Sequence, residues 1–143
     1  MQFRKGRAAH LRLGRTGERV ACRLLRDLGM EILVCNFSGR HGELDIVARD
    51  GDTLCFVEVK TRRRRRRSRP ADAVTAEKKW HIVSTARRYL NHLGHPEVVH
   101  RYDIVEVVFS RDRRRLLDVR HWPAAFSADD ARRPRWGQQP ILD

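Results

Sequence analysis

The feature that most constrains the fold is a turn signal, Asp50-Gly51-Asp52, between two short segments rich in Val, Ile, Leu and Phe. These segments, residues 43–49 and 53–61, have the length and composition of β-strands. An Asp-Gly dipeptide flanked by apolar segments is among the strongest short-range indicators of a β-hairpin. We therefore predict two adjacent antiparallel strands in this part of the chain.

The segments around this hairpin predict the rest of the topology. One helix is expected from an N-cap at Thr16 to Gly29, and a second from a cap at Thr75 to about Leu93. Further strands are predicted at residues 31–37, 101–109 and, as a short optional strand, 116–121. The order α-β-β-β-α-β predicts an α/β fold in which a mixed central sheet is flanked by helices.

The 143 residues suit one compact domain, which we place at residues 15–121. Residues 1–14 are predicted to be a basic N-terminal arm. Residues 122–143, which hold three of the five prolines, are predicted to be a loose C-terminal tail. Because there is no secretory signal and no apolar run long enough to cross a bilayer, a cytoplasmic protein without a membrane partner is expected.

Charge is the main indication of a partner. The chain has 31 Lys and Arg against 18 Asp and Glu, a formal net charge of +13. Such a chain attracts polyanions, because each neutralised phosphate releases condensed counterions. Nucleic acid is therefore the expected partner, and general arginine richness is the alternative explanation. Composition does not separate DNA from RNA.

The second strand of the hairpin carries an acid and a base two positions apart, Glu58 and Lys60. Side chains alternate along a strand, so both project from the same face. Asp45 lies on the preceding strand. It is directly opposite Glu58 if Gly51-Asp52 form the loop, and diagonal to it if Asp50-Gly51 do. The carbon positions are then about 5 Å or about 7–8 Å apart.

This spacing permits a carboxylate pair with a lysine beside it. Such a pair suits Mg²⁺ or Mn²⁺, because hard cations prefer oxygen ligands and complete their shell with water and phosphate. The backbone carbonyl of Val59 is a candidate further ligand, and Lys60 is a candidate to orient the attacking water. The alternative is a cross-strand ion-pair cluster of Asp45, Glu58, Glu43 and Lys60, without catalytic purpose.

Glu18 is a third candidate acid, in the first turn of the first predicted helix. An acid at that place stabilises the helix dipole and needs no other role. Residues alone therefore leave a catalytic role for Glu18 open.

The three cysteines, Cys22, Cys35 and Cys55, lack the spacing of a zinc site. Each lies within an apolar pattern, so all three are predicted to be buried free thiols. A chain of this length buries enough core to fold without a disulfide or a structural metal.

A basic run follows the candidate catalytic strand directly. It consists of Arg62, Arg63, Arg64, Arg65, Arg66 and Arg67. We expect this loop to hold phosphates on either side of the scissile one, although a solvated charge run is the alternative. Lys78, in the first turn of the second helix, is expected to bind nucleic acid as well, because free backbone donors there already favour phosphate.

Several short motifs occur in a specific order. They are Gly17-Glu18, Asn36-Phe37, Gly42-Glu43-Leu44-Asp45, Phe56-Val57-Glu58-Val59-Lys60-Thr61-Arg62, Val74-Thr75 with Lys78, and Arg101-Tyr102-Asp103. As an ordered set they resemble the YraN-like family of small bacterial proteins over roughly residues 14–109. That family is similar to PD-(D/E)xK nucleases, which have a restriction-endonuclease-like α-β-β-β-α-β core and include archaeal Holliday-junction resolvases among their relatives.

The resemblance implies roles for four residues. Asp45 and Glu58 would be metal ligands, Lys60 the catalytic lysine, and Glu18 a further ligand or a partner of the ligands. The chain departs from the family pattern at two places: Leu44 stands where the signature has proline, and the arginine run after Lys60 is unusually long.

The expected function is therefore that of a metal-dependent nuclease that hydrolyses phosphodiester bonds. DNA is favoured over RNA, and branched or damaged DNA is the substrate suggested by the resolvase-like relatives. The main alternative is a non-catalytic module that binds nucleic acid on a nuclease fold. A third is a basic protein that docks on another protein through its tail. A homodimer stays open, and no protein partner can be identified.

Overall fold

The computed structural model describes residues 3–64 and 73–133, with side chains from Gly14 onward. The elements are α1 (Phe3–Asp27), β1 (Glu31–Gly39), β2 (Gly42–Asp50), β3 (Thr53–Arg63), α3 (Ala76–His92), β4 (His100–Phe109), β5 (Leu116–Phe126) and a 3-10 turn at Ala128–Asp130. The predicted order α-β-β-β-α-β is confirmed, and the optional last strand is present. The architecture is consistent with a restriction-endonuclease-like core.

The strands form one mixed sheet in the order β1-β2-β3-β4-β5. Neighbouring strands are antiparallel except β3 and β4, which are parallel. Parallel neighbours need a long crossover, and here α3 lies in the connection between them. The predicted mixed sheet is therefore confirmed.

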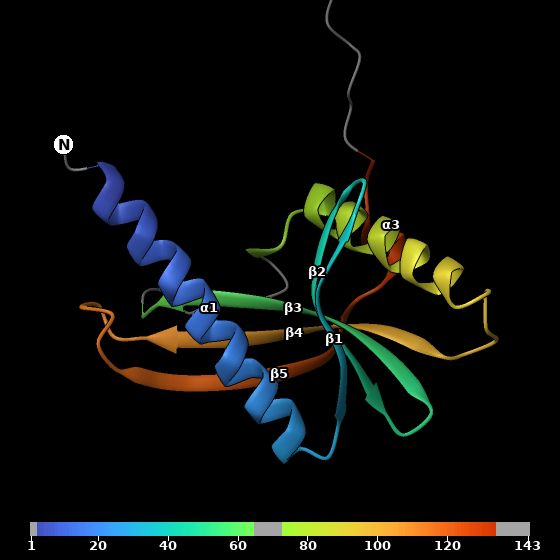
Figure 1. Ribbon diagram of the computed structural model, residues 1–143, viewed down its shortest axis with the longest axis horizontal. Helices are drawn as coiled ribbons and strands as arrows, with labels where there is room; N and C mark the ends of the chain where they lie inside the picture. The colour runs from blue at the N-terminus through green and yellow to red at the C-terminus, as the bar shows by residue number, and fades with distance from the viewer. Residues whose placement is uncertain (1–2, 65–72, 134–143) are drawn as a thin grey trace, which may run out of the picture.

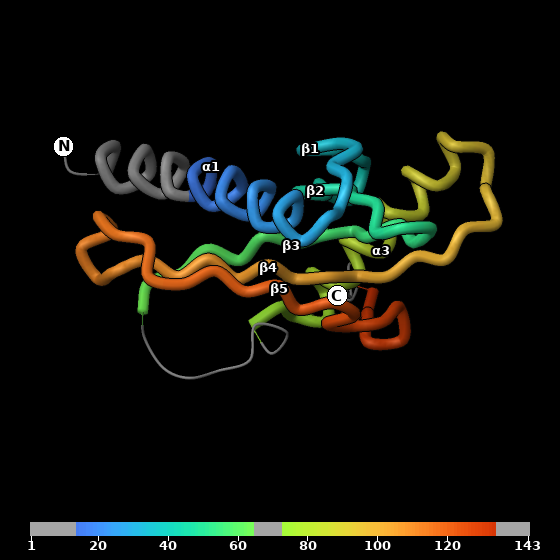
Figure 2. Tube along the Cα trace, turned by 90° about the horizontal axis from the view of Figure 1, so that it is seen from below, coloured from blue at the N-terminus to red at the C-terminus, as the bar shows by residue number. Residues whose placement is uncertain are grey.

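Helices α1 and α3 cover opposite faces of the sheet. Figure 1 shows α1 crossing the strands diagonally, and Figure 2 shows it as a separate layer above them. On the α3 side the buried core consists of Leu44, Val47, Leu54, Phe56, Val74, Ile82, Val83, Ala86, Tyr89, Tyr102, Ile104 and Phe126. On the α1 side it consists of Ala21, Leu25, Met30, Ile46, Ala48, Cys55, Val57, Val105, Val107 and Phe109. Because both faces are apolar, the central strands are buried between the helices.

Both helices end, and α3 also begins, at the capping residues that the sequence predicted. The Lys78 backbone N–H donates to Thr75 Oγ1 at 3.1 Å, which fixes the start of α3. Gly29 has a φ of +86°, and the Met30 N–H donates to the Leu25 carbonyl at 3.0 Å. This is the left-handed glycine motif that closes a helix.

The start of α1 corrects the prediction of a loose basic arm at residues 1–14. The helix begins at Phe3, well before the expected cap at Thr16. Residues 4–13 are mostly Arg, Ala, Leu and Lys, which have high intrinsic helix propensity, so a helix extends there without an apolar stripe to signal it. Among the described residues, no helix is both long and apolar enough to cross a membrane.

The end of the sheet corrects the prediction that the tail is loose from residue 122. Strand β5 continues to Phe126, whose ring is buried and stacks on Tyr102 with 5.3 Å between ring centroids. Pro123 is compatible with this edge strand because it lies in the register shift between the pairs Ile104↔Trp122 and Tyr102↔Phe126, where the regular ladder with β4 is interrupted. Residues 134–143 of the expected tail lie outside the described residues.

Asp103, fully buried on β4, joins the end of β5 to the sheet. Its carboxylate accepts hydrogen bonds from Arg101 Nε at 2.9 Å and the Ala124 N–H at 2.9 Å, and lies 2.8 Å from His121 Nε2. Burial opposes the ionisation of Asp103, but these hydrogen bonds outweigh it and hold its pKa below the usual value. The motif Arg101-Tyr102-Asp103 is therefore a structural anchor.

Candidate active site at the fork of two strands

The candidate site lies where β2 and β3 separate, beyond the pair Ile46↔Val57; we call this place the fork. Their pairing runs from Asp50↔Thr53 to Ile46↔Val57. Beyond that point β2 continues beside β1 alone and β3 beside β4 alone. Figure 1 shows the β1–β2 hairpin rising toward α3 while β3 stays with β4. Of the two predicted registers, the observed one has Asp50 opposite Thr53.

Asp45 is the first residue of β2 beyond the last pair. Its Oδ2 accepts a hydrogen bond from the Val59 N–H on β3 at 2.8 Å. The strand separation leaves this N–H without a ladder partner on β2, and the Asp45 side chain replaces the missing backbone carbonyl. The carboxylate is thus held against β3, next to Glu58.

Glu58 is a buried acid with an unpaired oxygen. The residue is 8% exposed, and its Oε2 has no hydrogen-bond partner within the described residues. Burial, followed by the neighbouring Asp45 carboxylate, raises the pKa of Glu58 to about 8. Because its negative charge is buried beside another carboxylate, Glu58 is stabilised by binding either a proton or a cation.

Two lysines act on Glu58 from different elements. Lys78, on α3, places its Nζ 3.7 Å from Glu58 Oε1. Lys60 follows Glu58 on the same face of β3. The positive charges of both lysines lower the pKa of Glu58, Lys78 more than Lys60, but the effect of burial is larger than either. The sequence predicted Lys78 to bind nucleic acid from a helix N-terminus, whereas its ammonium group also lies beside the buried acid.

Glu18 reaches the fork because α1 crosses close to β3 at Gly17. A Cβ at Gly17 would lie 2.1 Å from Thr61 Oγ1, so only glycine allows this approach. The next residue, Glu18, lies close enough to Asp45 for the two carboxylates to interact. Burial, then Asp45, raises the pKa of Glu18, while a hydrogen bond from Asn36 lowers it. The structure thus brings Glu18, Asp45, Glu58 and Lys60 to one place.

Asn36 is a residue of the candidate site that sequence reasoning did not single out. It lies on β1 between the pairs Cys35↔Ile46 and Phe37↔Leu44, and therefore opposite Asp45. With its amide nitrogen turned toward the acids, it donates to Glu43 Oε1 at 2.7 Å and Glu18 Oε2 at 3.3 Å. Its φ of +56° is a left-handed conformation that Asn tolerates better than most residues. Its presence in the motif Asn36-Phe37 was the only sequence signal.

The predicted alternative was a cross-strand ion-pair cluster of Asp45, Glu58, Glu43 and Lys60, with Glu43 opposite Lys60 if the hairpin pairing continued beyond Ile46↔Val57. The β2–β3 pairing ends at Ile46↔Val57, so Glu43 and Lys60 lie on separated arms of the fork. Glu43 instead contacts Asn36 on β1. The ion-pair alternative therefore loses Glu43 but keeps Asp45, Glu58 and Lys60, which still interact at the fork.

The residues at the fork fit a hard divalent cation in part. Within residues 14–64 and 73–133, no three His, Cys, Asp or Glu side chains are arranged as a complete metal site. Asp45 and Glu58 nevertheless place two carboxylates side by side, and Glu58 Oε2 has no hydrogen-bond partner among the described residues. Mg²⁺ is usually held by one or two carboxylates plus water. The carbonyl of Val59 stays a predicted ligand.

The arginine run is described only at its start. Arg62 Nη2 donates to Glu106 Oε2 at 2.8 Å, and Glu106 is 7% exposed, so Arg62 balances a buried acid. Arg63 is half-buried and Arg64 is exposed. Arg65, Arg66 and Arg67 lie outside the described residues. The phosphate-binding role of this loop stays a prediction.

Known proteins are similar to this chain over a segment that includes all the residues of the fork. The model of a family described as uncharacterised protein family UPF0102 matches residues 17–107. The chain is similar to UPF0102 proteins of Nocardia farcinica (44% identical; 80% of this chain and 88% of the relative), Parafrankia sp. (45%; 80% and 96%) and Chlorobium limicola (39%; 80% and 91%). The match extends from Gly17 to Val107 and includes every residue of the fork.

Proposed function

This chain belongs to the uncharacterised protein family UPF0102, and we propose that it is a metal-dependent nuclease that hydrolyses phosphodiester bonds in nucleic acid. The observation that carries the proposal is the state of Glu58. A buried carboxylate with an unpaired oxygen, set beside Asp45, is costly unless a ligand compensates its charge. Groups with such perturbed pKa values concentrate at functional sites.

The side chains at the fork suit this chemistry. Asp45 and Glu58 would hold the Mg²⁺ or Mn²⁺ ion, with Glu18 as a further ligand or a partner of the ligands. When bound, the ion supplies Lewis-acid polarisation of the phosphate and a more acidic water. Lys60 orients the attacking water or stabilises the charge that develops on the phosphate. The Val59 N–H keeps the Asp45 carboxylate in place for this role.

The substrate we propose is DNA in preference to RNA, in branched or damaged form. The formal net charge of +13 supports a polyanionic substrate. The arginine run, which begins with the last two residues of β3, would contact phosphates next to the scissile one. The preference for branched DNA depends on the resemblance to resolvase-like nucleases alone.

The test is cleavage of labelled single-stranded, duplex, flap and four-way-junction DNA, and of RNA, with Mg²⁺ or Mn²⁺. Glu58→Gln and Lys60→Met keep side-chain size but remove the charge, and we expect each to slow cleavage roughly 10²-fold or more while binding persists. Glu97→Gln, an exposed acid in the connection before β4, is the control and should cleave like the wild type.

The second candidate function is a module that binds nucleic acid without cutting it. The same positive charge supports binding with or without catalysis. Tight binding without cleavage of any substrate in either metal would favour this module. Equal cleavage by wild type, Glu58→Gln and Lys60→Met would instead show that the fork is not the catalytic site.

A further inference from the structure

Two cysteines from different elements are in contact. Cys22 Sγ on α1 lies 3.8 Å from Cys35 Sγ on β1, and both thiols are free. A disulfide has a sulfur separation of about 2.05 Å, so the two sulfurs, already in contact, would have to approach by roughly 1.8 Å for a bond to form. All three cysteines are free thiols, as predicted, but only Cys55 is buried; Cys22 is half-buried and Cys35 is exposed, so the prediction of burial was wrong for these two.

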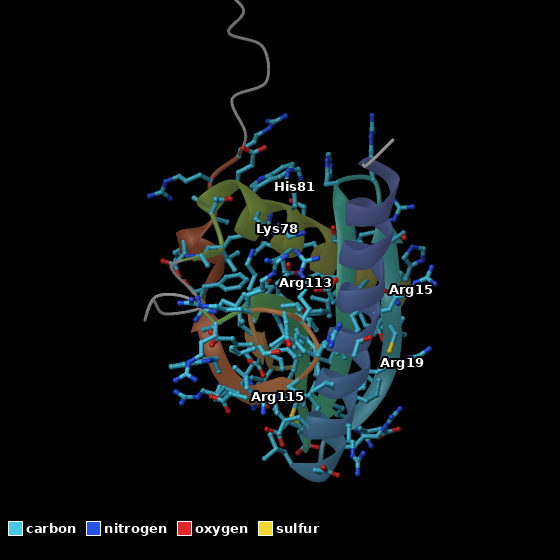
Figure 3. All side chains as sticks on the ribbon, turned by 90° about the vertical axis from the view of Figure 1, so that its left-hand side faces the viewer. Arg15, Arg19, Lys78, His81, Arg113 and Arg115 are labelled. Carbon is cyan, nitrogen blue, oxygen red and sulfur yellow. The ribbon has the colours of Figure 1, made fainter. Side chains whose placement is uncertain are left out.

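The pair lines a pocket between α1 and β1. The pocket has a volume of about 430 Å³ and is lined by Arg15, Glu18, Arg19, Cys22, Arg26, Cys35 and Asn36. Figure 3 shows Arg15 and Arg19 extending from α1. Three guanidinium groups against one carboxylate give the pocket a net positive charge, which attracts a small molecule that carries carboxylates.

We propose that Cys22 and Cys35 form a reversible disulfide, made by exchange with a small acidic disulfide of the glutathione type that enters this pocket. In the first step the Cys35 sulfur attacks the small disulfide, giving a mixed disulfide at Cys35 and releasing one small thiol. In the second step the Cys22 sulfur attacks the Cys35 sulfur and releases the other small thiol. Two protein thiols are oxidised and one small disulfide is reduced to two thiols.

The order of these steps follows from exposure. Burial, and then the neighbouring Cys35, raises the pKa of the Cys22 thiol to about 11, so Cys22 is the poorer first nucleophile. The exposed Cys35 meets the oxidant first, and the contact with Cys22 allows closure of the bond.

The bond would fix α1 to β1 beside the fork. Cys22 is one helical turn after Glu18, and Cys35 precedes Asn36, which donates to Glu18. Oxidation would therefore hold Glu18 against Asn36, close to Asp45. This consequence for the site depends on the proposed function, whereas the disulfide itself does not.

The test uses the purified full-length chain, reduced, and then equilibrated in glutathione buffers of increasing oxidised fraction without nucleic acid. After alkylation, intact mass and peptide mapping should show an internal Cys22–Cys35 bond, with the loss of two hydrogens. Because the bond would constrain the unfolded chain across the loop from Cys22 to Cys35, the thermal midpoint should rise by about 10 °C and fall again with dithiothreitol.

Three variants make the test specific. Cys22→Ser and Cys35→Ser should each abolish the bond and the thermal shift, whereas Cys55→Ala, which changes the buried third thiol, should retain both. Complete alkylation of both thiols in oxidising buffer, or a mixed disulfide at Cys35 that never closes, would overturn the proposal. The mass measurement does not involve cleavage of nucleic acid. A protein that forms the Cys22–Cys35 disulfide but cleaves nothing would therefore contradict the proposed nuclease activity and leave the proposed disulfide standing.

Discussion

At the scale of single residues, Glu58 makes the stability of the protein depend on pH in a specific direction. Its pKa is about 8 in the folded protein against an ordinary value of 4.5. The folded state therefore binds more protons than the unfolded state between these values, and stability falls as pH rises through this window. Above about pH 8 the full penalty of an ionised buried acid remains.

Replacing Glu58 by Gln should remove this dependence. We expect the thermal midpoint of the wild type to fall relative to that of Glu58→Gln as the pH is raised from about 4.5 to about 8. Saturating Mg²⁺ or Mn²⁺ should reduce the fall in the wild type only, because a bound cation compensates the carboxylate. Parallel curves for the two proteins would mean that Glu58 is not buried in the manner described.

The residues of the fork differ in how far the sequence could predict them. Asp45, Glu58 and Lys60 were predictable because a hairpin and strand alternation define one face. The choice between two registers was not, since both suit the turn sequence. Asn36 and the contact of Lys78 with Glu58 depend on where β1 and α3 pack, and no spacing along the chain encodes that.

At the scale of elements, Gly17 sets how closely α1 approaches β3. A methyl group there would lie 2.1 Å from Thr61 Oγ1, which belongs to a short branched side chain on a strand and has little freedom to move. We expect Gly17→Ala to destabilise the fold by about 1–3 kcal/mol, as overpacking does, measured by urea unfolding. Glu18 would move away from Asp45 with the helix.

Gly14 on the same helix provides the matched control. A Cβ there meets nothing within 4 Å, so Gly14→Ala should be neutral or should stabilise by up to about 1 kcal/mol through helix propensity. The double variant Gly17→Ala/Thr61→Ala should recover most of the stability that Gly17→Ala removes. Equal effects of both glycine substitutions would show that propensity, and not the crossing, explains Gly17.

The two element boundaries that the sequence placed wrongly have distinct physical causes. The apolar stripe from which α1 was predicted begins only at Val20, whose neighbours pack on the sheet. The residues of α1 before it gave no periodic signal in the sequence. Strand β5 contains Pro123, which argued for a tail. The hydrogen bond from the Ala124 N–H to Asp103 and the stacking of Phe126 on Tyr102 outweigh that local signal, and both are long-range contacts.

At the scale of the whole molecule, the net charge should set the overall affinity for nucleic acid. The number of phosphates that cationic side chains contact should set how steeply this affinity falls with salt. Each phosphate bound by a cationic side chain adds about 0.9 to the slope of log affinity against log salt on duplex DNA. Arg62 already balances Glu106, so the contribution expected from the run lies in the arginines after it.

Replacing Arg64, Arg65, Arg66 and Arg67 by Gln should therefore flatten this slope by about 0.9 for each phosphate that the loop no longer neutralises. The control carries the same change in net charge through Arg23→Glu and Arg87→Glu, two exposed arginines on α1 and α3. Overall charge alone would lower affinity similarly in both proteins. A slope reduced only in the loop variant would locate the bound phosphates beside the end of β3. Equal slopes in the two variants would assign binding to the general field of the protein and remove the loop from the proposed site.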